Sequence, residues 1–145
     1  MPFRQKFLAP TQESSDPALL LKSVLSVLLI LSAVSLSVGG YLLYVNSLVP
    51  LFLVETTVVA VVVLYILSYF VAKGNTLSIN LSTALGVIAP IMSASTPAHV
   101  GVLQQLGNGG LISLLGLLQL LGFYVFPITF VVLRIVLRSR LSKTS

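Results

Sequence analysis

The chain contains no cysteine and little charge among its 145 residues. Without cysteine, disulfides, thiolate catalysis and cysteine-ligated metals are all excluded. The one histidine, His99, cannot build a histidine-based metal site without partners, and the three acids (Glu13, Asp16 and Glu55) lie far apart in sequence. No nucleophile, base and orienting group can be named together. The sequence therefore predicts no catalytic, cofactor-binding or metal site, and a protein that is not an enzyme.

A long stretch of the chain has no formally charged residue: no Asp, Glu, Lys or Arg occurs from Gly74 to Leu133. Hydrophobic residues make up 57% of the chain and charged residues 8%, against roughly 25% charged in ordinary soluble domains. A soluble domain needs charges on its surface. A span of this length without them predicts contact with hydrocarbon, either membrane lipid or many copies of the same chain.

The apolar runs predict one all-α domain over residues 1–145, a hydrophobic bundle of four transmembrane-type helices in two hairpins. Asp16 suits a helix N-cap and Pro17 the first helical position, and Pro127 predicts a kink in the last helix. The stretch from Val100 to Leu106 could add a helical turn or extend the third helix. The predicted segments are a polar basic arm at 1–16, helices at 17–45, 49–72, 76–93 and 111–141, and a polar uncharged loop at 94–110.

An even number of spans places both termini on one side, together with the turn at Lys73. That side then holds all eight basic residues, and the opposite side holds no Lys or Arg. In a membrane this arrangement satisfies the positive-inside rule, with both termini cytoplasmic. The eight are Arg4, Lys6, Lys22, Lys73, Arg134, Arg138, Arg140 and Lys143.

The strongest local signal is the basic C-terminal segment from Arg134 to Lys143. Arg134 and Arg138 are about one helical turn apart and project from the same face. One interpretation is a stop-transfer anchor whose side chains reach the lipid headgroups. The other is a face that neutralises nucleic-acid phosphates without reading sequence.

Isolated polar residues point to packing and solvation more than to chemistry. Glu55 is expected to be an interfacial carboxylate, although ion handling is an alternative. His99 is expected to be structural or solvated, and Gln119 to pack within or between subunits or to line a pore. The spacing of Ala33 and Ser37 allows close helix–helix approach.

In its charge-free spans, its Arg134–Lys143 tail, its lack of cysteine and its Ser/Thr-rich turns, the chain resembles the major capsid proteins of large tailed spindle-shaped archaeal viruses, the monocaudavirus type. The resemblance covers the whole chain and involves no short motif. It implies a structural virion protein that resides in the host membrane before many copies assemble into a helical or spindle-shaped shell around double-stranded DNA. It also implies non-specific phosphate contacts through Arg4, Lys6, Lys73, Arg134, Arg138, Arg140 and Lys143.

Two other functions fit the same composition. One is the hydrophobic pilin of an archaeal conjugation-type or DNA-import pilus, which usually needs only one helical hairpin. The other is a small four-helix membrane channel or transporter subunit. Charges facing a pore would favour the second, and the chain offers only Glu55 and Lys22 near the ends of its apolar segments.

Overall fold

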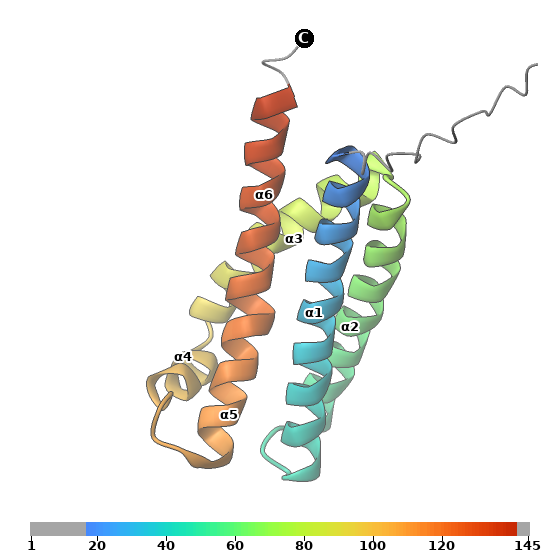
Figure 1. The fold of residues 1–145 in the computed structure, drawn as a ribbon. Helices are drawn as coiled ribbons and strands as arrows, with labels where there is room; N and C mark the ends of the chain where they lie inside the picture. Colours follow the sequence, from blue (N-terminus) through green and yellow to red (C-terminus); the bar gives the residue numbers. More distant parts are fainter. Residues whose placement is uncertain (1–16, 142–145) are drawn as a thin grey trace, which may run out of the picture.

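The computed structural model describes residues 17–141, which form helices joined by short turns (Figure 1). Four helical stretches are long and apolar enough to cross a membrane: 18–45, 51–72, 76–94 and 110–136. The predicted all-α fold with four transmembrane-type helices is confirmed. Asp16, the predicted N-cap, lies outside the described residues. The elements are α1 (Pro17–Val45), α2 (Leu51–Ala72), α3 (Thr76–Ala94), α4 (Pro97–Gln104), α5 (Gly110–Gln119), the π-helix η1 (Leu120–Val125) and α6 (Phe126–Leu141).

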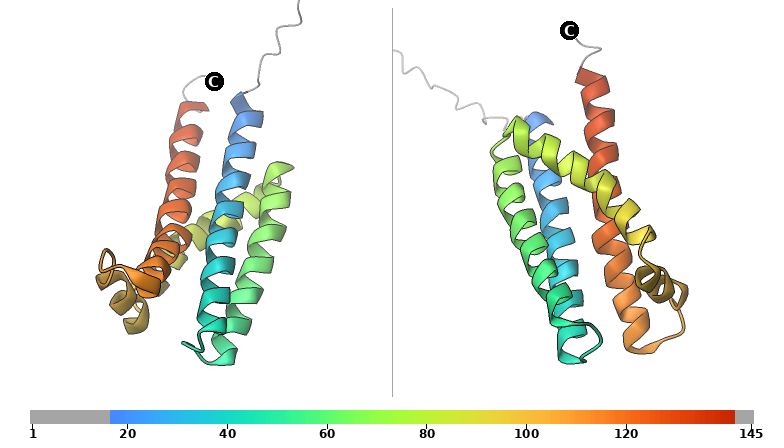
Figure 2. Two further views of the ribbon diagram at one scale, coloured as in Figure 1. Left: turned by 60° about the horizontal axis from the view of Figure 1, so that its bottom comes forward. Right: turned by 180° about the vertical axis from the view of Figure 1, so that it is seen from behind.

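The helices form one bundle in which two helical units lie side by side (Figures 1 and 2). Helices α1 and α2 make a long hairpin, and α5, η1 and α6 form a second rod beside α1. Helix α3 crosses obliquely from the end of α2 and packs against α6. The start of α1, the α2–α3 turn and the end of α6 therefore lie at the same end of the bundle. This confirms that both ends of the helical domain are on one side.

The distribution of side chains is the reverse of that in a soluble protein. Most large apolar side chains are exposed, for example Leu77, which is 67% exposed. The apolar core is small and is centred on Leu25, Val71 and Phe130. Seven serines are buried beside it: Ser26, Ser32, Ser35, Ser68, Ser78, Ser82 and Ser93. Small polar side chains let helices approach closely and bond across the contact, which is the packing mode of helices in lipid.

The segment 94–110, predicted as a polar loop, instead contains α4, and this corrects the prediction. Pro97 stands at the start of α4, where its missing N–H costs nothing and its fixed φ suits a helix. Helix α4 packs on α5 at Gly116, where an added Cβ would lie 3.0 Å from the Val102 carbonyl oxygen. Pro97 therefore begins a helix in a segment that its proline and glycines had indicated as a loop.

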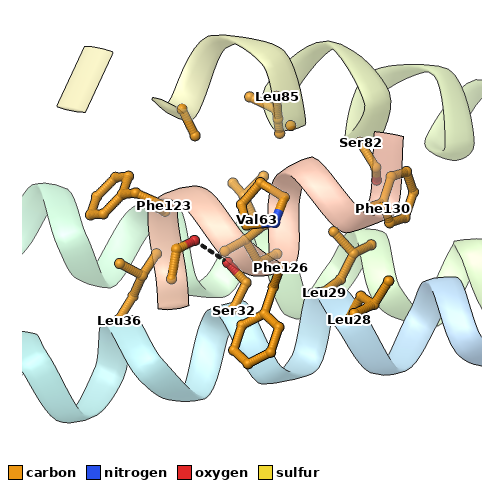
Figure 3. Close-up of a pocket in the computed structure, with 16 residues that line it drawn as sticks. Leu28, Leu29, Ser32, Leu36, Val63, Ser82, Leu85, Phe123, Phe126 and Phe130 are labelled. Atoms are coloured by element: carbon orange, nitrogen blue, oxygen red, sulfur yellow. Dashed lines mark hydrogen bonds between the residues drawn. The ribbon is translucent and has the colours of Figure 1, made fainter. Parts of the chain in front are cut away.

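Near Pro127, the predicted kink position, the helix contains the π-helix η1, which ends two residues before the proline at Val125. The Phe126 N–H donates to the Leu121 carbonyl, five residues back. In the same pattern the Gly122 carbonyl would accept from residue 127, but proline has no N–H. Ser32 of α1 supplies the donor, with its Oγ 2.6 Å from the Gly122 oxygen (Figure 3). A Cβ at Gly122 would meet Leu36 at 3.0 Å, so glycine allows this close approach.

Replacing Ser32 by alanine is expected to lower the free energy of unfolding by about 0.5 to 2 kcal/mol, because the Gly122 carbonyl loses its donor in an apolar setting. Ser37→Ala is the matched control, since Ser37 Oγ bonds only the Ala33 carbonyl of its own helix. Thermal unfolding followed by circular dichroism in detergent measures both variants. An equal loss in both would contradict a special role for the Ser32–Gly122 bond.

Candidate phosphate-binding end

Three of the seven predicted phosphate-binding residues have described side chains: Lys73, Arg134 and Arg138. Arg140 lies in α6, but its side chain is not described, and Arg4, Lys6 and Lys143 lie outside the described residues. We call the part of the bundle that holds the start of α1, the α2–α3 turn and the end of α6 the basic end. The final turns of α6 project beyond α1 and α2 at this end (Figure 1).

Lys73 ends α2 in the turn that leads into α3. Its side chain is exposed, and its Nζ lies 5.5 Å from the centre of the Tyr69 ring. The next residue, Gly74, has a φ of +76°, which favours glycine. Asn75 then caps α3, with its Oδ1 accepting a hydrogen bond from the Ser78 N–H at 2.9 Å. This turn presents an accessible ammonium at the basic end.

Lys22 was not among the predicted site residues, but the structure brings it to the same turn. Its side chain reaches Gly74 so closely that a Cβ there would lie 2.8 Å from the Lys22 Nζ. A lysine one to two turns inside a membrane-type helix extends its ammonium toward the polar boundary. The position of Lys22 near the start of the first helix indicates that its side chain can reach the polar boundary. The sequence does not show that this side chain points toward the α2–α3 turn.

Arg134 has a different environment from the other basic residues. Its Nη1 donates to the Ile79 carbonyl at 2.9 Å and to Thr83 Oγ1 at 2.6 Å, and its Nη2 donates to Asn80 Oδ1. All three acceptors belong to α3, so the guanidinium ties α6 to α3. Arg134 thus has a structural role that the sequence did not reveal.

Arg138 lies about one turn further along α6 and is exposed. It borders a groove between α3 and α6 whose other lining residues include Asn80, Val87, Arg134 and Ile135. Because Arg134 already donates to α3, Arg138 and Lys73 are the basic side chains most available to an external phosphate among those that the structure describes.

Arg134→Ala is expected to lower the free energy of unfolding by about 1 to 3 kcal/mol, since three charge-assisted hydrogen bonds between α3 and α6 are lost. Arg138→Ala, the control from the same helix face, is expected to leave stability nearly unchanged. Chemical unfolding in detergent compares the two. Similar losses for both would show that the Arg134 contacts do not stabilise the bundle.

A polar cluster stands at the opposite end, where α3, α4 and α5 meet. The Gln119 Nε2 donates to Ser93 Oγ at 3.1 Å and to the His99 carbonyl at 3.1 Å. Ser93 Oγ also lies 3.2 Å from His99 Nδ1, and the His99 ring packs on Phe123 with 5.4 Å between ring centres. Gln119 therefore packs within the bundle, which is the first of its two predicted roles. His99 has a structural role in the same cluster.

Burial of the His99 ring lowers its pKa below the ordinary value of 6.5. The unfolded chain then takes up a proton more readily than the folded chain. Stability is expected to be full above pH 6.5 and to fall as the pH drops from 6.5 through the folded-state pKa.

Unfolding in detergent at pH 7.5 and pH 5.5 measures this effect, and His99→Gln is expected to reduce the difference between the two values. A pH dependence of the same size in His99→Gln would assign it to other groups.

Glu55 is exposed near the start of α2, at the end of the bundle opposite the basic end. Within residues 17–141, no group of three or more histidine or acidic side chains could hold a metal ion. Residues 17–141 therefore form an all-α bundle with a basic end and four helices capable of crossing a membrane. Comparisons of the chain with protein-family models, with curated proteins and with solved structures find no match.

Proposed function

We propose that this chain is a structural virion protein, a major capsid subunit that polymerises into a helical or spindle-shaped shell around double-stranded DNA. The observation that carries the proposal is the combination of an apolar outer surface with cationic groups at one end only of the described bundle. A subunit of this kind can contact its copies through its sides and nucleic acid through its basic end. Before assembly the same surface would reside in the host membrane.

The sides of the bundle supply the contacts between copies. Exposed aliphatic side chains run along α2 and α3, among them Val59, Ile66, Leu77 and Ile91. Burial of apolar surface is favourable without being directional, so it needs no matched charges. Copies would exchange contact with lipid for contact with each other.

The basic end supplies the contacts with DNA. Lys73 and Arg138 are exposed there, and Arg4, Lys6, Arg140 and Lys143 belong to the same charge cluster by sequence. Such contacts neutralise phosphates, release counterions and depend strongly on salt. Arg134 contributes by fixing the position of α6, which carries Arg138.

A pilin or a channel subunit would share the apolar exterior. Neither needs to enclose DNA, so protection of DNA separates these functions. Native particles that contain this chain are expected to protect double-stranded DNA from nuclease. Intact particles whose DNA is digested, or pili and detergent micelles that hold no DNA, would reject the capsid proposal.

The phosphate contacts are tested by replacing Arg138 and Arg140 together with glutamine. The logarithm of the DNA-binding constant should then depend less steeply on the logarithm of salt concentration, by roughly one to two units of slope. The pair Arg138→Lys and Arg140→Lys keeps both charges and is expected to retain the slope. An unchanged slope in the glutamine variant would assign these arginines to membrane anchoring.

A further inference from the structure

A cavity of about 200 Å³ lies at the centre of the bundle, where α3 crosses the other helices (Figure 3). Its walls come from α1, α2, α3, η1 and α6, and most of them are aliphatic or aromatic. Phe123, Phe126 and Phe130 form one side, and Leu29 and Leu85 lie among the residues around it. An apolar cavity of roughly 150 Å³ in another protein stays dry and binds benzene, so this one has room for part of a hydrocarbon chain.

One polar atom in the cavity wall has no partner. Ser82 is 1% exposed, and its Oγ is the buried side-chain oxygen or nitrogen without a hydrogen-bond partner within the described residues. The other buried hydroxyls that face across helices behave differently: Ser26 donates to the Ser68 carbonyl at 2.9 Å, and Ser32 donates to Gly122. A buried hydroxyl without a partner is costly, and a ligand oxygen in the cavity would satisfy it.

The cavity communicates with the apolar outer surface between α2 and α3. Ala60 and Val63 of α2 and Leu85 of α3 line the cavity and are also exposed. Helix α3 diverges from α2 as it crosses the bundle (Figure 2). In a membrane, a molecule that enters here would come from the hydrocarbon and not from water.

We propose that this cavity binds part of one hydrocarbon chain of a membrane lipid, whose linkage oxygen (ester or ether) accepts a hydrogen bond from Ser82 Oγ. Ser82 lies six residues after Thr76, the first residue of α3 at the basic end. At 1.5 Å per residue it is about 9 Å along the helix, and less in depth because α3 is oblique. Ser82 is therefore close enough to the basic end to be reached by the linkage oxygen of a lipid whose headgroup lies at that end.

The first experiment uses the full chain in vesicles of a phosphatidylcholine with a photoreactive diazirine in one acyl chain. After illumination, mass spectrometry locates the labelled residues. Label is expected on Phe126 and Phe130 in addition to outward-facing residues such as Ile66 and Leu85. Label confined to outward-facing residues would overturn the proposal.

Two alanines of α3 provide a matched pair of variants. Ala89 lines the cavity, whereas Ala84 is exposed and borders the groove beside Arg138. Ala89→Leu is expected to reduce cavity labelling by at least about fivefold, because the added side chain takes the space of the acyl chain. Ala84→Leu is expected to leave it unchanged. Equal labelling of the cavity in both variants would reject acyl-chain binding, and Ala60→Leu repeats the test from α2 if Ala89→Leu does not fold.

Ser82→Ala tests the hydrogen bond separately. Labelling by the ester lipid is expected to fall about fivefold, the effect of one lost hydrogen bond, while labelling by a diazirine-bearing alkane stays the same. A lipid signal that does not change would remove Ser82 from the site. None of these measurements involves DNA, so they succeed or fail independently of the capsid proposal.

Discussion

The bundle depends on one constraint: in an apolar setting every backbone carbonyl needs a donor from within the protein. Pro127 breaks this condition in the longest helical rod, because it removes the N–H that the Gly122 carbonyl would use. The π-helix shifts the pattern of hydrogen bonds, and Ser32 brings α1 close enough to supply the missing donor. The hydrogen bond from Ser32 therefore joins the two helical units at the carbonyl that Pro127 leaves without a backbone donor.

Other contacts between helices also depend on small residues and on hydroxyl groups. Ser26 bonds the backbone of α2, and Gly86 lets α3 approach α6 so closely that a Cβ would lie 2.8 Å from Val131. Arg134 makes a similar contact with a charged group, because its guanidinium donates to the backbone and side chains of α3. The large apolar side chains are then left for the outside. A structure held from within by small polar groups does not need its aliphatic surface for folding, so that surface is available to lipid or to other subunits.

The sequence predicted the features that depend on composition and length. Long apolar runs indicated the four helices, and the position of the basic residues indicated which ends lie together. The sequence did not reveal contacts that depend on three-dimensional direction. Nothing near Arg134 in the chain indicates that its guanidinium turns toward Ile79 and Thr83, because those residues are more than fifty positions away. Pro97 and Gly101 indicated a loop, yet Pro97 begins α4, since a proline at the first helical position looks the same in sequence as one in a turn.

Helix α4 makes the two ends of the bundle different. It packs on α5 at the end opposite the basic residues, whereas the final turns of α6 extend past α1 and α2 at the basic end (Figures 1 and 2). A body with unlike ends gives a layer with unlike faces only when all copies point the same way. In a layer of parallel copies one face would consist of uncharged helical turns and the other of separate basic projections.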